Sequence, residues 1–145
     1  MDIYQKIKTI STSARSWAEA YAKVKKFPDD LNGMCAIASA KLFEMLDREP
    51  GLTPSIAIWH DNKSHGVHCF LICNQYLVDI TATQFGNFSE VEVINLLNVD
   101  KKRFYFWNYD TVLKSVDDLM MYQEHTPWVE KSQVTIKVLN WRSRG

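Results

Sequence analysis

The sequence predicts an α+β fold in which one helix packs on an antiparallel β-sheet, and two observations lead to this class. The first is the segment 34–48, which is rich in alanine and other helix-forming residues and ends just before Pro50. The second is a series of three apolar runs, 54–60, 67–73 and 76–83, separated by short polar turns typical of an antiparallel meander. The small side chains at the start of the helix allow close packing, so we expect this helix to be central and buried.

The composition is that of one globular domain spanning residues 1–145. A chain of 145 residues with 46% hydrophobic content can bury a core of its own. The 17 basic and 17 acidic residues cancel, and the longest basic run is only residues 101–103, so neither nucleic acid nor a membrane surface is an expected partner. No stretch approaches the roughly 18 apolar residues of a membrane span. The sequence indicates no cofactor and no oligomeric state.

The cysteine content favours a reducing, cytoplasmic compartment. Residues 1–10 carry charges where a signal peptide carries an apolar run, and three cysteines do not form a complete disulfide framework. Cys69 and Cys73 would lie roughly 13 Å apart along an extended strand, too far to ligate one zinc ion together. We therefore expect free thiols and no metal site.

The N-terminal segment 2–27 is predicted to be helical, in two pieces, with Ser11 or Ser13 as a cap. Its stripe of Trp17, Tyr21 and Val24 has helical spacing and is expected to pack on the core.

The remaining segments predict further elements. Residues 28–33 are predicted to form a loop with turns that precedes the central helix and ends at a glycine. Ser89 and Glu92 resemble a capping box for a helix through Leu97. Later segments predict a strand over 103–109, a helix over 111–125 and a final strand over 133–139.

Cys35 is the candidate nucleophile because it opens the predicted central helix. Unpaired backbone N–H groups and the positive end of the helix dipole stabilise an anion there, which favours the reactive thiolate. The Cys35 backbone N–H and the side-chain amide of Asn32 are candidate donors to a developing oxyanion.

Strand geometry selects His68 and Asp79 as its partners. If Asn74-Gln75 is a two-residue hairpin turn, Cys73 lies opposite Tyr76. His68 and Asp79 then become diagonal neighbours on one face of the sheet, within hydrogen-bond reach. A turn of odd length would move Asp79 to the other face, so the assignment depends on this register.

Three further residues are weaker candidates. Trp59, with His60 after it, closes a strand and is a candidate for lining the substrate groove, although such aromatics usually belong to the core. Gln84 follows the Asp79 strand and is a candidate hydrogen-bond donor in the site, although a solvated loop glutamine is the commoner case. His65 is a second-ranked alternative to His68 and is expected to point elsewhere.

The order of these residues resembles that of the papain-like and transglutaminase-like cysteine amidohydrolases. The matching segments are 32–43 (NGMCAIASAKLF), 66–73 (GVHCFLIC) and 76–85 (YLVDITATQF), in the middle of the chain, and the resemblance is greatest to compact deamidases and peptidases. It implies an α+β fold with the nucleophile helix packed on an antiparallel sheet, and the cytosol of a host or phage-infected cell as the setting. Two departures leave subfamily and substrate open: Asp29 stands where papain-type enzymes have an oxyanion glutamine, and the step from His68 to Asp79 is short.

The expected function is hydrolysis of an amide bond in a protein or peptide substrate. Cys35 would attack the carbonyl carbon and form a thioester, His68 would serve as base, and Asp79 would orient the histidine. Glutamine deamidation and peptide cleavage both remain open, as does acyl transfer to an amine. Each of the three residues alone is more often structural, and the alternative is a non-catalytic protein-binding module on a papain-like frame.

Overall fold

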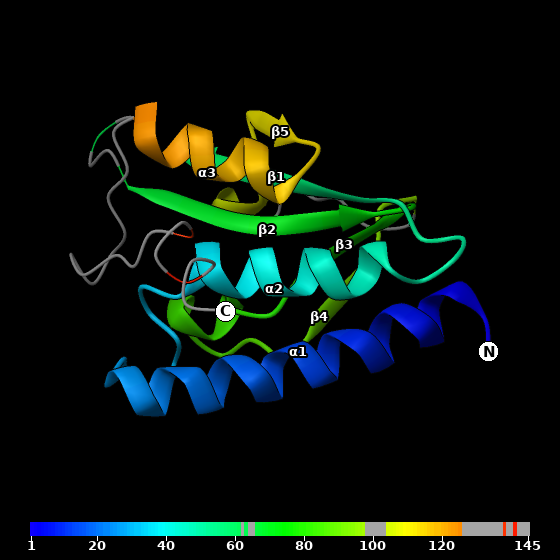
Figure 1. Ribbon diagram of the computed structural model, residues 1–145, viewed down its shortest axis with the longest axis horizontal. Helices are drawn as coiled ribbons and strands as arrows, with labels where there is room; N and C mark the ends of the chain where they lie inside the picture. The colour runs from blue at the N-terminus through cyan, green and yellow to red at the C-terminus, as the bar shows by residue number, and fades with distance from the viewer. Residues whose placement is uncertain (62, 64–65, 98–103, 126–137, 139–140, 142–145) are drawn as a thin grey trace.

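The computed structural model describes residues 1–61, 63, 66–97, 104–125, 138 and 141. Within them, five strands form one antiparallel sheet in the order β4-β3-β2-β1-β5, and helices accompany it in an α+β arrangement, which confirms the predicted fold class (Figure 1). In chain order the elements are α1 (Ile3–Lys25), α2 (Cys35–Asp47), β1 (Pro54–His60), β2 (Val67–Cys73), β3 (Tyr76–Asp79), η1 (Ala82–Phe85), β4 (Glu92–Asn95), η3 (Tyr105–Trp107), β5 (Thr111–Leu113) and α3 (Val116–His125).

Two buried clusters of side chains lie on opposite faces of the sheet. Figure 1 shows α2 lying along β2, with α1 beyond it. The helix-side cluster joins α1, α2 and α3 to alternate residues of β2, namely Cys69, Leu71 and Cys73. The aromatic-side cluster contains the other alternation of β2 at Phe70, together with Phe106 and Trp107 of η3. Because successive strand residues point to opposite faces, β2 contributes to both clusters and is buried on both sides.

The N-terminal segment is one continuous helix, so the predicted division into two pieces is wrong. Asp2, rather than Ser11 or Ser13, is the N-cap, and its carboxylate accepts the Gln5 N–H at 2.8 Å. Ser11 is instead fully buried on the face that continues through Ala14 and Ala18. This unbroken stripe of small residues lets α1 pack closely along its whole length, which explains why no break occurs.

The predicted aromatic stripe of α1 is only partly correct. Trp17 and Tyr21 stack with ring centroids 5.1 Å apart and pack against the helix-side cluster. Val24, however, is 77% exposed and lies outside the core. Among the residues described, no helix combines the length and apolar character needed to span a membrane.

The central helix and the first two strands have the predicted positions, and β3 is shorter than predicted. β3 ends at Asp79 and the chain turns into η1, because the Asp79 carboxylate accepts the Thr81 N–H at 2.9 Å. A side chain that captures a backbone N–H two residues later favours a turn over a continued strand.

The predicted helix after Ser89 is wrong, because this segment forms strand β4. Ser89 does bond to the Glu92 carboxyl, but burial outweighs this bond and raises the pKa of Glu92 above its ordinary value. Val93 and Ile94 are β-branched, and β4 pairs with β3 along its whole length, from Tyr76 opposite Asn95 to Asp79 opposite Glu92. Pairing with an available strand edge outweighs the local capping signal.

The later predictions are also corrected. The aromatic segment 103–109 forms the short 3-10 helix η3 where it is described, and does not form a strand. The segment predicted as a helix over 111–125 divides into β5 and α3, and the Ser115 hydroxyl between them accepts the Asp118 N–H at 3.0 Å as a cap. The predicted strand 133–139 lies outside the described residues except for Val138.

Candidate functional site

His68 and Asp79 form a buried hydrogen-bonded pair, as the sequence predicted. Cys73 pairs with Tyr76 across the turn, so the register is the expected one. His68 Nε2 lies 2.7 Å from Asp79 Oδ2, and both side chains are fully buried. Asn74 has a φ of 54°, which is the left-handed conformation that a tight two-residue turn requires.

Asp79 is held by three donors. Its Oδ2 accepts the Trp107 indole N–H at 2.8 Å in addition to the bond to His68, and its Oδ1 accepts the Thr81 N–H at 2.9 Å. Burial by itself would raise the pKa of Asp79, but the charge of His68 and the bonds from His68, Trp107 and Thr81 outweigh it and hold the pKa below its ordinary value. The carboxylate is therefore fixed in position and ionised.

The imidazole of His68 lies in the aromatic-side layer. Its ring contacts Phe85 and Phe106 edge-on, at centroid distances of 4.8 and 5.5 Å. With Nε2 turned to Asp79, Nδ1 lies on the opposite side of the ring, 3.5 Å from Nε2 of Gln84. The Gln84 amide is itself fixed, because it donates to the Thr81 carbonyl at 3.0 Å. Gln84 is thus buried beside the histidine and is not a solvated loop residue.

Cys35 is the first residue of α2, and its side chain is 1% exposed within the helix-side cluster. One turn later, the Ser39 hydroxyl donates to the Cys69 carbonyl of β2 at 3.1 Å. Cys69 is adjacent to His68, so this bond brings the N-terminal end of α2 to the start of β2 (Figure 1). Cys35 and His68 therefore lie at the same end of their elements, with Cys35 in the helix-side cluster and His68 beside the aromatic rings of Phe85 and Phe106.

The two other cysteines have features of structural residues. Cys73 is fully buried, and burial raises the pKa of its thiol to about 11. Cys69 is also fully buried, in the helix-side cluster. Neither lies at a helix N-terminus, so Cys35 is the only described cysteine with that electrostatic setting.

The loop before Cys35 has a constrained backbone. Leu31 is fully buried at a φ of 64°, and Gly33 has a φ of 90°. A left-handed conformation is costly for leucine and free of that cost for glycine, so Gly33 adopts it without strain whereas Leu31 does not. The side-chain oxygen of Asn32 is buried with no hydrogen-bond partner in the described part of the chain.

Trp59 lies directly opposite His68 in the pairing of β1 with β2, whereas the next residue, His60, belongs to a separate pair. Trp59 is half-buried and packs edge-on against Tyr105 at 5.2 Å. His60 forms a second His–Asp pair, with Nδ1 2.6 Å from Asp110 Oδ1, and its Nε2 lies 2.6 Å from the Tyr122 hydroxyl. Because the Asp110 carboxylate is 47% exposed, this second pair lies at the surface, unlike the first. His65 lies outside the described residues.

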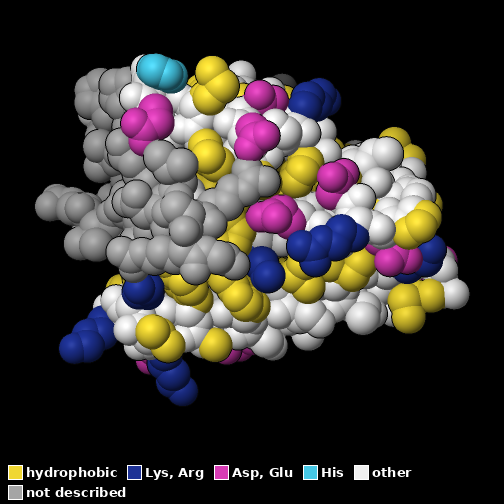
Figure 2. All heavy atoms as spheres, viewed as in Figure 1, with side chains coloured by type: hydrophobic (Ala, Val, Ile, Leu, Met, Phe, Trp, Pro, Cys, Tyr) yellow, Lys and Arg dark blue, Asp and Glu magenta, His cyan; other side chains and the backbone are white. Residues whose placement is uncertain are grey.

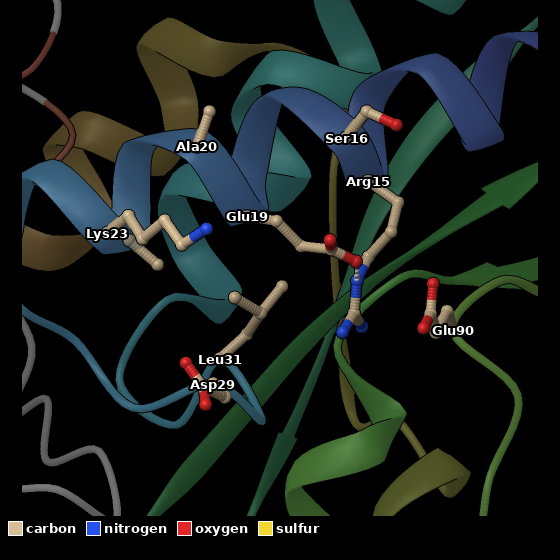
Figure 3. A pocket seen from close by; sticks show the side chains of 9 residues that line it. Arg15, Ser16, Glu19, Ala20, Lys23, Asp29, Leu31 and Glu90 are labelled. Atoms are coloured by element: carbon tan, nitrogen blue, oxygen red, sulfur yellow. Dashed lines mark hydrogen bonds and ion pairs between the residues drawn. The ribbon is translucent and has the colours of Figure 1, made fainter.

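A groove of about 570 Å³ runs between α1 and the loop that precedes α2. Figure 3 shows Arg15 projecting from α1 between Glu19 and Glu90, with Asp29 and Leu31 on the loop side. On the face shown in Figure 2, acidic and basic side chains of the described residues are interspersed with hydrophobic ones. The groove itself has both signs of charge on its walls.

Two contacts of the site were missed by sequence reasoning. Trp107 lies in the segment 103–109 that the sequence predicts to be a strand, and nothing in this aromatic run indicates a bond to Asp79, 28 positions earlier. Arg15, which bonds to the chain just after Asp79, lies in a helix that was read as packing alone. The available signal was the cost of burying Asp79, which requires more donors than one histidine.

Among the described residues, no cluster of three or more His, Cys, Asp or Glu side chains is arranged to hold a metal ion. No family model matches this chain, and no curated protein or solved structure matches it either. The fold and the site together define an α+β protein with a five-stranded antiparallel sheet and a buried His–Asp pair at the end of its central hairpin.

Proposed function

We propose that this protein is a cysteine-dependent amide hydrolase with a papain-like or transglutaminase-like fold, in which Cys35, His68 and Asp79 form the catalytic triad. One observation carries the proposal: Asp79 binds Nε2 of His68 and is itself fixed by Trp107 and Thr81, so that Nδ1 is the nitrogen available as a base. Burying the Asp79 carboxylate costs free energy, and a role in orienting the His68 imidazole explains why the protein keeps it with three donors.

The reaction proceeds through a thioester. Nδ1 of His68 takes the thiol proton of Cys35, and the sulfur attacks the carbonyl carbon of a protein or peptide amide. The C–N bond then breaks, and the imidazolium returns the proton to the departing ammonia or amine. Water attacks the thioester with His68 as base, which releases the acid and restores the thiol.

Oxyanion stabilisation falls to donors around the tip of α2. The Cys35 backbone N–H is at a helix start, where such groups lack intrahelical acceptors. The Gln84 amide is within 3.5 Å of the imidazole and is the second donor. The Asn32 side-chain amide is the third and weakest candidate.

Access to the site requires movement of side chains. Cys35 is 1% exposed and His68 is fully buried, so a substrate carbonyl reaches them only when part of the surrounding layer opens. Phe85 is half-buried and lies edge-on against His68, so rotation of this side chain would open a path to the imidazole. Opening of this kind is common where closed sites exclude water.

The test is the rate at which iodoacetamide alkylates each cysteine between pH 5 and 10, together with release of ammonia or new amines from a glutamine-rich peptide mixture. We expect Cys35 to react fastest near neutral pH, and Cys35→Ala to abolish both its labelling and the release. Cys69→Ala is the matched control, because it removes a buried thiol of the adjacent strand and should leave the release unchanged. Equal, slow labelling of all three cysteines would reject the proposal.

The burial of Cys35 and His68 favours one second candidate, a non-catalytic protein-binding module on the same frame. In that case the His68–Asp79 pair serves stability alone, and Cys35→Ala changes neither binding nor any chemical product. Intact-mass analysis of candidate targets separates the two candidates, because deamidation adds about one dalton, peptide-bond cleavage gives fragments and binding leaves the mass unchanged.

A further inference from the structure

Arg15 is a charged residue of α1 that is almost completely buried, with 5% of its surface exposed. Its Nη1 donates to the Ile80 carbonyl at 2.9 Å and to the Thr83 hydroxyl at 3.0 Å, while its Nε donates to Glu19 at 2.8 Å. The first two acceptors lie directly after Asp79, at the point where β3 ends. Arg15 therefore holds the segment that emerges from the Asp79 strand.

Thr83 also binds the loop that precedes Cys35. The Thr83 hydroxyl accepts from Arg15 and donates its own proton to the Asp30 carbonyl at 3.1 Å. Asp30 in turn accepts the Asn32 N–H on its carboxylate at 3.0 Å. A chain of hydrogen bonds thus joins Arg15, Thr83 and Asp30, and it links the segment after Asp79 to the loop before Cys35.

The sheet does not provide this link. The pairing of β2 with β3 stops at Leu71 and Val78, so the segment after Asp79 has left the ladder. The loop before α2 contains Leu31 at a φ of 64°, a conformation that leucine keeps only when its surroundings fix it. Both segments need support from a third element, and α1 supplies it.

We propose that Arg15 is a positioning residue that, through Thr83, couples the Asp79 strand end to the Cys35 loop. This inference rests on the proposed function, since it assigns the coupling to the geometry of the triad. A role in stability alone is a weaker explanation, because a buried guanidinium often contributes no more to stability than a well-packed apolar side chain of similar size. Figure 3 shows that Arg15 also forms part of the groove wall, so a molecule bound in the groove would contact this residue directly.

Arg15→Met and Thr83→Val test the coupling in the full chain, with Thr83→Ser as the conservative variant that keeps the hydroxyl. Lys8→Met is the matched control, because Lys8 also donates from α1 to a loop carbonyl, that of Val91 at 3.1 Å, but does so outside the chain of bonds that joins Arg15, Thr83 and Asp30. Two readouts are used: hydrogen exchange of the backbone amides in residues 29–34, and the pH profile of Cys35 alkylation. A purely structural role lowers Tm and leaves that pH profile unchanged.

We expect Arg15→Met and Thr83→Val each to speed exchange in the loop by about fivefold or more and to slow Cys35 alkylation at neutral pH by a similar factor, the size expected for one buried hydrogen bond. The double variant should be no worse than Arg15→Met, since both act through one chain of bonds. Thr83→Ser and Lys8→Met should resemble the unmodified protein.

Unchanged loop exchange and an unchanged alkylation profile in Arg15→Met and Thr83→Val would overturn the inference, as would fully additive effects in the double variant. If Arg15→Met does not fold, Thr83→Val alone decides. Slow alkylation of Cys35 in the unmodified protein would instead reject the proposed function, and the positioning role with it. Faster loop exchange in the variants would in that case still establish the mechanical link.

Discussion

Replacing Asp79 by asparagine tests whether the buried His68–Asp79 pair needs the two acceptor oxygens of a carboxylate, as its contacts indicate. The two side chains have nearly the same shape, but asparagine has one NH2 group where aspartate has an acceptor. Oδ2 of Asp79 accepts from His68 and Trp107, and Oδ1 accepts from Thr81. Either orientation of the amide therefore turns an NH2 group toward a donor.

The magnitude follows from these contacts. One buried donor left without an acceptor costs about 1–3 kcal/mol, and the remaining bonds lose the extra strength of a charged acceptor, about 1 kcal/mol each. Asp79→Asn should therefore lower the free energy of unfolding by about 3–5 kcal/mol. Asp110→Asn is the internal control, because it changes the exposed His60–Asp110 pair and should cost about 1 kcal/mol or less.

The assay is urea denaturation followed by tryptophan fluorescence, measured at several pH values. Because the pKa of Asp79 is lower in the folded than in the unfolded protein, its contribution is fully present above the ordinary aspartate range and is lost as the pH falls through the lowered value. Asp79→Asn should remove this acid-side loss. A cost below about 1 kcal/mol, or an acid-side slope like that of the unmodified protein, would refute the reasoning.

Three further predictions concern single contacts. Trp107→Phe removes one bond to Asp79 at 2.8 Å and should cost about 1.5–3 kcal/mol in urea denaturation; a neutral result would mean that the indole bond does not stabilise the carboxylate. Gly33→Ala places a side chain at a φ of 90° and should cost about 1–2 kcal/mol and slow Cys35 alkylation, whereas an unchanged Tm would show that the loop adapts freely. Cys73, whose pKa is raised to about 11, should stay unlabelled by iodoacetamide at pH 8 until urea unfolds the protein; labelling in the folded state would contradict its burial.

The parts of the fold that the sequence predicts well are those governed by local rules. The polar dipeptide Asn74-Gln75 between two apolar runs predicted a two-residue turn, and this turn sets the register that brings His68 to Asp79. The prediction of that pair needed only the alternation of strand side chains and the cost of burying an aspartate.

The errors arose where distant contacts outweigh local signals. Ser89 and Glu92 have the spacing of a helix cap, but the open edge of β3 pairs with this segment and makes it a strand. The bonds of Asp79 to Trp107 and of Arg15 to Ile80 span 28 and 65 positions. No local pattern encodes such bonds, so the contributions of Trp107 and Arg15 to the site could not be predicted from the sequence.

The early end of β3 has a consequence for how the site can vary. Continued in the same register, the central hairpin would pair Phe70 with Asp79 and then Cys69 with Ile80. The carbonyls of Cys69 and Ile80 are bound instead by Ser39 from α2 and Arg15 from α1. Where β2 and β3 separate, the backbone is thus bound by helix side chains, while β1 and β4 still pair with His68 and Asp79 on their outer sides. Substitutions in either helix can therefore change the backbone position at Cys69 and Ile80 while the strand pairing of the sheet is kept.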